Sequence, residues 1–171
     1  MQLLRNTILI IATCLTVAGC GFHLRGSQTL PPDINAVTST SVVAHSLLKR
    51  ELDERLNVYE IPRKPFDTVT RSDMSDTVII RLLPETIERR LLSVFSTGQV
   101  AEYELIYGVN YTVTFPGHDP INAYFEIMRD YQDDPDRVLA KSRELDLVVS
   151  EMRKEAADRI IRRLALQASE L

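Results

Sequence analysis

The sequence predicts an α+β fold: a two-layer sandwich in which an antiparallel, meander-like sheet of about four strands is covered on one face by two helices. Three observations lead to this expectation. Residues 103–115 alternate between apolar and polar side chains, as a strand with one buried face does. Two other segments repeat apolar residues at helical spacing, and the C-terminal one is long. Short stretches with Gly and Pro separate the strand-like segments.

The longest expected strand runs from Tyr103 to Phe115. Every odd position in it is large and apolar or aromatic, and among the even positions only Ile106 is a large apolar residue. Most of the tyrosines at odd positions are therefore expected to face the helices as core. Residues 116–120 form a turn rich in Pro and Gly, and the next strand returns antiparallel. The alternating residues of that strand are Ile121, Ala123, Phe125 and Ile127.

The remaining strands are expected upstream. Ala36–Ser41 mixes β-branched and polar residues and predicts a short strand. Thr77–Phe95 is strand-like, but Pro84 cannot donate a backbone hydrogen bond, so it predicts a break or a sheet edge there. Residues 96–98, Ser-Thr-Gly, supply the hairpin turn into the long strand.

Two helices are expected to cover the sheet. Val42–Leu56 carries apolar residues on one face, and Asn57 is a suitable end for it. The second helix runs from Pro135 to about residue 168, with Asp134 as its N-cap, and would be roughly 50 Å long. Its apolar stripe consists of Leu145, Val149, Met152, Ala156, Ile160 and Leu164.

The N-terminus predicts a lipoprotein signal peptide over residues 1–19. Arg5 is the only charge there, and the apolar stretch of residues 8–18 is too short for a bilayer span of about 20 residues but suits a signal peptide. The stretch ends in Val-Ala-Gly before Cys20, whose thiol would carry the lipid. The alternative is an ordinary secretory signal that ends near a cysteine. Gly21, rather than Asp, follows the cysteine and favours the outer membrane.

The expected domain organisation follows from this cleavage. Residues 20–35, with two Gly and two Pro, form the lipidated N-terminus and tether, and residues 36–171 form a single domain. Cys14 leaves with the signal peptide, so an acylated Cys20 leaves no thiol for a disulfide. Without Arg5, 19 basic residues face 24 acidic ones, and the net charge of −5 argues against nucleic acid as a partner. No later apolar run is long enough to cross a membrane.

The sequence offers no set of residues typical of catalysis. His23, His45 and His118 have no second metal ligand at a useful spacing, and phosphate-binding and nucleophile motifs are absent. The acidic residues at 133–136 are explained by capping of the long helix. We therefore expect neither an enzyme nor a metal or other cofactor, apart from the lipid on the cysteine. A small periplasmic hydrolase is the least favoured alternative.

One segment indicates a binding role. Residues 88–95, Glu-Arg-Arg-Leu-Leu-Ser-Val-Phe, combine Arg89 and Arg90 with four apolar residues just before a hairpin turn. They could bind an amphiphile, with arginines on phosphates and apolar side chains on acyl chains, or they could form an ordinary half-buried strand. Lys141 could extend the basic patch from the long helix or could lie on its solvated face. The residues alone leave these alternatives open.

Three stretches together resemble one protein family. They are residues 19–26 (GCGFHLRG), residues 93–103 (SVFSTGQVAEY) and residues 134–152, which begin Asp-Pro and include Ala-Lys at 140–141. Their order and spacing are similar to those of the LptE family of lipopolysaccharide-assembly lipoproteins. The resemblance covers essentially the whole chain after the signal peptide.

The resemblance implies a function. It implies an α/β sandwich that plugs and helps to assemble the outer-membrane β-barrel LptD, forms with it the translocon for lipopolysaccharide, and binds lipopolysaccharide itself. It implies a diacylglycerol and an N-acyl chain on Cys20. It also implies barrel contacts at Phe95, Ser96 and Gly98 and a lipopolysaccharide site that includes Lys141. Relatives often carry a basic residue where Ser96 stands, so Arg89 and Arg90 are hypothesised to supply that charge.

A second binding role remains as an alternative. The chain could be an accessory lipoprotein of another envelope machine, such as an ABC-transporter auxiliary subunit or a barrel-assembly subunit. Such a protein would share the anchor and the fold class, but not the combination of motifs at residues 93–103 and 134–152.

Overall fold

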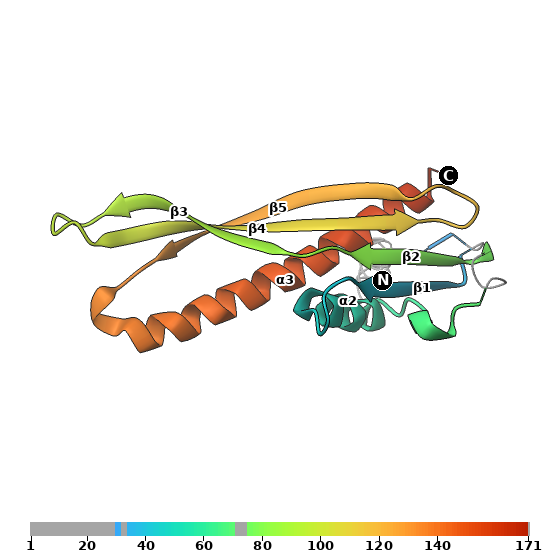
Figure 1. The fold of residues 1–171 in the computed structure, drawn as a ribbon, viewed down its shortest axis with the longest axis horizontal. Coiled ribbons are helices and arrows are strands. Elements are labelled where there is room, and N and C mark those ends of the chain that lie inside the picture. The colour runs from blue at the N-terminus through green and yellow to red at the C-terminus, as the bar shows by residue number, and fades with distance from the viewer. Residues whose placement is uncertain (1–29, 32–33, 71–74, 171) are drawn as a thin grey trace, which may run out of the picture.

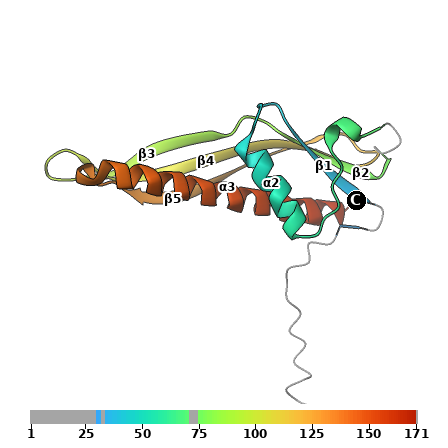
Figure 2. The same cartoon turned by 90° about the horizontal axis from the view of Figure 1, so that it is seen from below.

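The protein folds into two layers, a five-stranded sheet and two α-helices on one of its faces (Figures 1 and 2). This computed structural model describes residues 30–31, 34–70 and 75–170. The predicted α+β sandwich with a long C-terminal helix is confirmed. The elements are β1 (Ala36–Ser41), α2 (Leu47–Val58), η1 (Phe66–Thr68), β2 (Thr77–Leu82), β3 (Thr86–Val94), β4 (Val100–Thr114), β5 (Ile121–Gln132), η3 (Pro135–Arg137) and α3 (Val138–Ala168).

Strand β4 is the axis of the sheet. It pairs antiparallel with β5 along one edge and with both β2 and β3 along the other. Between the pairs Leu82–Tyr111 and Thr86–Gly108, three residues on one strand face two on β4, which is a β-bulge. Pro84 lies in this bulge, where its missing N–H costs no ladder hydrogen bond. The predicted break is thus confirmed, and β2 and β3 are two parts of one interrupted strand.

The expectation of a wholly antiparallel sheet is wrong for one pair of strands. Strand β1 pairs parallel with β2, from Ala36 opposite Thr77 to Ser41 opposite Leu82. The sheet therefore has five strands instead of about four, and one of its pairs is parallel. The reason is that α2 and the segment after it form a crossover connection, which returns the chain to the end of the sheet where β1 began.

Helix α2 begins later than the apolar spacing predicted. The expected start was Val42, but the helix starts at Leu47, and Ser46 caps it by accepting a hydrogen bond from the backbone N–H of Lys49 at 3.1 Å. His45 has a φ of +56°, which ends any helical continuation toward the N-terminus. The spacing of apolar residues gives no information about the cap at Ser46 or the positive φ of His45. At the other end the helix stops at Val58, one residue beyond the predicted Asn57.

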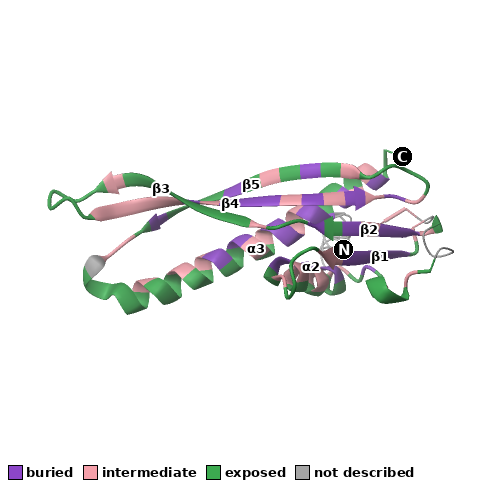
Figure 3. Ribbon diagram, viewed as in Figure 1, coloured by how far each residue is buried: buried purple, intermediate pink, exposed green. Residues whose placement is uncertain are grey.

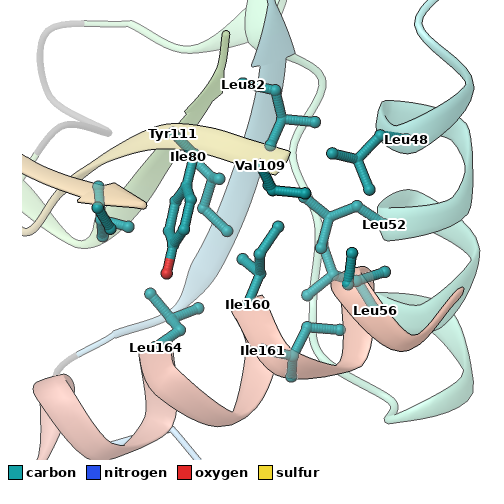
Figure 4. Packing of buried hydrophobic residues seen from close by; sticks show 14 of the residues in the cluster. Leu48, Leu52, Leu56, Ile80, Leu82, Val109, Tyr111, Ile160, Ile161 and Leu164 are labelled. Atoms are coloured by element: carbon teal, nitrogen blue, oxygen red, sulfur yellow. The ribbon is translucent and has the colours of Figure 1, made fainter. Parts of the chain in front are cut away.

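The core lies between the sheet and both helices. The odd-numbered residues of β4 from Leu105 onward are buried, and both fully buried tyrosines, Tyr107 and Tyr111, are among them. The prediction that most of these tyrosines form core is confirmed. Figure 4 shows leucines of α2 meeting isoleucines of α3 beneath β2 and β4. The leucines are Leu48, Leu52 and Leu56, and the isoleucines are Ile160 and Ile161.

Burial is uneven along the length of the domain (Figure 3). All buried residues of α3 lie between Val149 and Ala168, so the predicted stripe is buried except for Leu145, which is partly buried. Strand β3 contains no buried residue. We call β1, α2, β2 and residues 149–168 of α3 the closed end, and β3, residues 100–104 of β4 and residues 138–148 of α3 the open end. Figure 1 shows α3 diverging from the sheet toward the open end.

The N-terminal predictions lie outside the described part of the chain. The signal peptide of residues 1–19, Cys20 and most of the tether of residues 20–35 fall there, so they stay predictions. In the residues that the structure does describe, no helix is long and apolar enough to cross a membrane.

Candidate binding groove at the open end

A groove of about 430 Å³ separates the sheet from α3 at the open end. Its floor is formed by Tyr103 and Tyr131, which are paired across β4 and β5. Its other wall is the first part of α3. The lining residues are Arg89, Tyr103, Tyr131, Asp133, Val138, Lys141, Ser142 and Leu145. The first part of α3 diverges from the sheet here (Figure 1), and the groove lies between the two.

The structure separates the two candidate arginines. Successive side chains of a strand point to opposite faces of the sheet. Arg89 is paired with Leu105, whose side chain faces the helices, so Arg89 lines the groove. Arg90 is paired with Glu104 on the uncovered face, and its guanidinium forms a salt bridge with that carboxylate. The two arginines therefore cannot hold one ligand in the groove together.

Lys141 reaches the same groove from α3. Its Nζ lies 5.2 Å from the centroid of the Tyr131 ring, and the Tyr131 hydroxyl donates a 2.6 Å hydrogen bond to the Lys141 carbonyl. Its Nζ also lies 2.9 Å from a carboxylate oxygen of Glu144. That hydrogen bond is the main reason why the pKa of Lys141 is raised above its ordinary value. The ammonium is thus charged at neutral pH and held at the groove wall.

The groove is suited to an amphiphile. It presents a guanidinium from Arg89 and an ammonium from Lys141, with Asp133 as the one carboxylate among its lining residues. Between them lie the tyrosine rings and the aliphatic side chains of Val138 and Leu145. Cations bind phosphates or carboxylates by charge-assisted hydrogen bonds, and the apolar surface fits hydrocarbon. Such a groove is suited to hold an amphiphile by non-covalent contacts.

Sequence reasoning missed much of this groove. Most of the odd-numbered tyrosines of β4 were expected in the core, and Tyr103 is the exception: it lies beyond the buried stretch of α3 and is only partly buried. Val138 and Ser142 gave no signal at all. The alternation did carry a usable signal for Arg89 and Arg90, because neighbouring strand residues must face opposite sides.

The predicted barrel-contact residues Phe95, Ser96 and Gly98 lie at the tip of the β3–β4 hairpin, at the far end of the molecule (Figure 1). The Phe95 N–H donates to the Gln99 carbonyl at 2.7 Å, and the Gly98 N–H donates to the Phe95 carbonyl at 2.9 Å. Gly98 has a φ of +85°, a conformation that favours glycine. Four apolar side chains in and just before this hairpin tip are exposed: Leu91, Leu92, Val94 and Phe95.

The described residues contain no candidate metal centre. Among them, no three His, Cys, Asp or Glu side chains lie closely enough together to hold an ion. The fold and the groove together define a class of protein: a small α+β sandwich domain with a groove lined by cations and apolar side chains, and with an apolar hairpin at one end.

Comparison with known proteins identifies the family within that class. The family model described as "LptE: Lipopolysaccharide-assembly" matches residues 33–164. The chain is 32% identical over 158 residues to the LPS-assembly lipoprotein LptE of Pectobacterium atrosepticum, a match that covers 92% of this chain and 83% of that protein. It is 31% identical over 165 residues to the protein of the same name from Yersinia enterocolitica, over 94% of this chain and 77% of the other.

Solved structures agree with this result. The crystal structure of the rare lipoprotein B from Shewanella oneidensis matches with a TM-score of 0.69 and 40% identity, over 80% of this chain and 98% of that one. A solution structure of a lipoprotein B from Nitrosomonas europaea has a TM-score of 0.67 at 23% identity, over 87% of this chain and 93% of the other, and shows the same fold. The chain belongs to the LptE family, as the sequence resemblance predicted. This is a family of assembly lipoproteins and is not known as a family of enzymes.

Proposed function

We propose that the protein is an outer-membrane lipoprotein that plugs and helps to assemble the LptD β-barrel. In this role it forms part of the translocon that inserts lipopolysaccharide into the outer leaflet, and it binds lipopolysaccharide itself. Membership of the LptE family supports the assembly role. The observation that carries lipopolysaccharide binding is the groove, where Arg89 and Lys141 flank apolar side chains.

The chemistry of lipopolysaccharide matches this groove. Its lipid A carries phosphates on sugars and acyl chains below them, so cations and hydrocarbon surface are needed side by side. Arg89 and Lys141 supply the cations, and Tyr103, Val138 and Leu145 supply the apolar surface. Of the three predicted basic residues, Arg90 is directed to the other face and is already paired with Glu104.

Barrel contact is proposed for the hairpin tip. Phe95 is 44% exposed, and its apolar neighbours Leu91, Leu92 and Val94 are at least as accessible. Exposed apolar surface near one end of a fold is typical of protein interaction sites. The backbone hydrogen bonds from the Phe95 N–H to the Gln99 carbonyl and from the Gly98 N–H to the Phe95 carbonyl close a tight turn at this tip, so the hairpin can enter a confined space such as a barrel lumen.

The anchor is proposed to be a diacylglycerol and an N-acyl chain on Cys20, with Gly21 favouring the outer membrane. Mass spectrometry of the N-terminal peptide from envelope-purified protein tests this. A peptide that begins at Cys20 with the mass of the lipid chains is expected, and an unmodified peptide would remove the anchor from the proposal.

Lipopolysaccharide binding is tested with charge-removing variants at the groove. Arg89→Gln combined with Lys141→Gln is expected to weaken binding of purified lipopolysaccharide by roughly ten-fold or more, since two charge-assisted contacts are lost. Arg90→Gln is the matched control for Arg89→Gln alone, because each removes one arginine charge and the two positions lie on opposite faces of the sheet. Equal affinities of the double variant and the wild type would refute the groove as the site.

The barrel partnership is tested by purification of the tagged full-length protein from its native envelope in mild detergent, with mass spectrometry after a salt wash. A stoichiometric outer-membrane barrel is expected. Recovery of a transporter complex would favour the alternative, an accessory lipoprotein of another envelope machine.

A further inference from the structure

A second cavity lies at the closed end, away from the groove and the hairpin. It has a volume of about 640 Å³ and opens between the C-terminal part of β1, the start of α2 and the segment of residues 63–67. Figure 1 places these elements at the other end of the domain from the β3–β4 tip. The cavity volume is in the range of small-molecule sites in proteins.

The cavity is basic in a protein that is acidic overall. Four cations line it, and two carboxylates accompany them, so its wall carries a net charge of +2 while the chain carries −4. The cations are Lys49, Arg50, Arg63 and Lys64, and the carboxylates are Asp53 and Asp67. Lys64 also lies 3.8 Å from the Asp76 carboxylate, which is not part of the wall. The excess of positive charge therefore rests on Arg50 and on the two cations that share Asp53.

Asp53 holds these two cations in fixed positions. The Lys49 Nζ lies 2.8 Å from one of its carboxylate oxygens, and the Ser39 hydroxyl donates to the other. A guanidinium nitrogen of Arg63 donates a 2.6 Å hydrogen bond to the Asp53 backbone carbonyl and lies 3.7 Å from the carboxylate. One carboxylate therefore orients two cations, and positive charge is left over at the cavity wall.

The start of α2 adds to this excess. A helix N-terminus carries partial positive charge and is stabilised by acidic residues in its first turn. The first turn of α2 has no acidic residue and instead contains Lys49 and Arg50. Arg50 is exposed and forms no ion pair within the described chain. The positive helix end repels both cations, and an anion in the cavity would relieve that repulsion.

The topology places the cavity where ligands commonly bind. β1 and β2 run parallel, and α2 follows β1 directly. In sheets with parallel strands, ligands lie beyond the carboxyl ends of the strands, next to the N-terminus of the following helix. The end of β1 and the start of α2 occupy this position, and Thr40, Ser41 and Ser46 line the cavity there.

We propose that this cavity binds a phosphate-bearing ligand of the size of a phosphorylated glycerol or sugar headgroup. Lysine and arginine side chains donate charge-assisted hydrogen bonds to phosphate oxygens, and the helix terminus faces the same anion. The volume accommodates more than a bare ion. Such a headgroup can arrive as a soluble phosphate ester or on a lipid. The site is distinct from the groove and does not rest on lipopolysaccharide binding there.

Calorimetric titration of the full-length protein in a non-ionic detergent tests the proposal. The probes are glycerol 1-phosphate, for a soluble source, and dihexanoyl-phosphatidylglycerol below its micellar concentration, for a lipid source, with glycerol as the uncharged control. Binding of at least one phosphate probe and none of glycerol is expected. The probe that binds more tightly identifies the source.

Two variants locate the binding. Lys49→Gln combined with Arg50→Gln should weaken binding of the phosphate probe by roughly ten-fold or more. Arg50→Gln alone should weaken it less, and it should leave thermal stability unchanged or higher, because a repelled charge leaves the helix start. Lys154→Gln, an exposed lysine of α3, is the matched control and should change nothing.

Absence of binding by both phosphate probes, or equal affinity in the wild type and the folded double variant, would overturn the proposal. The groove variant with Arg89→Gln and Lys141→Gln should retain the phosphate probe. Failure here therefore leaves the proposed function intact, and failure of lipopolysaccharide binding at the groove leaves this site intact.

Discussion

The closed and open ends of the domain use the same layers, a sheet with a helix beneath it, but they are packed differently. At the closed end α2 adds a second helix, and Leu52 and Ile160 lose all contact with solvent. At the open end β3 has no buried residue, and the described residues 138–148 of α3 include none either. The apolar side chains there, Leu91 and Leu139 among them, remain exposed.

The difference follows from geometry. Helix α3 has 31 residues and would extend roughly 46 Å at 1.5 Å per residue, whereas strands twist along their length. A single helix therefore stays in contact with only part of a long, twisted hairpin. The end that is covered by two helices holds the buried core, and the end that is left open exposes more of its apolar and charged side chains to solvent. Binding regions are commonly drawn from the less stable parts of a fold.

The same substitution at the two ends should give very different losses of stability. Leu52→Ala removes a side chain that is 0% exposed, and we expect the free energy of unfolding to fall by about 2–5 kcal/mol. Leu91→Ala removes a side chain that is 55% exposed, and a change within about 0.5 kcal/mol is expected. Urea denaturation followed by circular dichroism measures both. Similar losses at the two positions would break the distinction between the ends.

The stability of the protein should decrease at alkaline pH because of Tyr107, which lies where the closed and open ends meet. The hydroxyl of the fully buried Tyr107 donates to the Glu85 carboxylate in the bulge, and the Arg153 Nε of α3 lies 3.3 Å from the other oxygen. Burial, and then the Glu85 carboxylate, raise the pKa of Tyr107 far above its usual value. The folded protein keeps this proton where the unfolded chain releases it, so stability should fall as pH rises above about 10.

Tyr107→Phe isolates this effect. The variant lacks the ionisable hydroxyl, so its loss of stability between pH 8 and pH 11, measured by urea midpoints, should be smaller than that of the wild type. Lysine deprotonation affects both proteins in this range and cancels in the comparison. An identical decline in the two proteins would show that Tyr107 does not hold its proton more strongly in the folded state.

The smallest expected effect concerns the open end. Glu144 accepts a hydrogen bond from Lys141 and competes with any anion for that ammonium. Glu144→Gln should raise the affinity of the groove for lipopolysaccharide by roughly two- to five-fold, in line with an exposed ion pair. Glu151→Gln, which changes an exposed glutamate of the same helix outside the groove lining, is the control. Unchanged or weaker binding in the Glu144 variant would mean that Glu144 does not compete for Lys141.

Much of the fold was predictable because its signals are local. The alternation that predicted β4 and the apolar stripe of α3 both depend on neighbouring residues. The predicted start of the long helix is wrong by one short turn: Asp134 caps the 3-10 helix η3, where its side chain accepts from the Asp136 N–H, and α3 itself begins at Val138. The break at Pro84 was predictable from a missing donor. The late start of α2 was not, because it depends on a backbone turn at His45 that apolar spacing does not register.

The candidate site was predictable only in part. Lys141 and Arg89 were selected as basic residues in an apolar setting, and the structure brings both to one groove. Arg90 was grouped with them because it is adjacent in sequence, and the strand sends it to the opposite face. Tyr103 could not be told from the other odd-numbered tyrosines of β4, most of which were expected in the core, since nothing in the sequence marks where a helix diverges from a sheet.

The sequence by itself determined where most strands and both helices lie, the buried faces of β4 and α3, and the resemblance to the LptE family, because periodicity and motifs are properties of contiguous residues. Only the tertiary structure decided that β1 runs parallel to β2, that Arg89 and Lys141 share a groove, and that Lys49 and Arg63 share a cavity. The physical reason is that the strand pairing, the groove and the cavity all depend on the distance between the sheet and the helices and on the path of the connecting segments. Such relations join residues distant in the chain, and pairing and packing set them only once the layers have assembled.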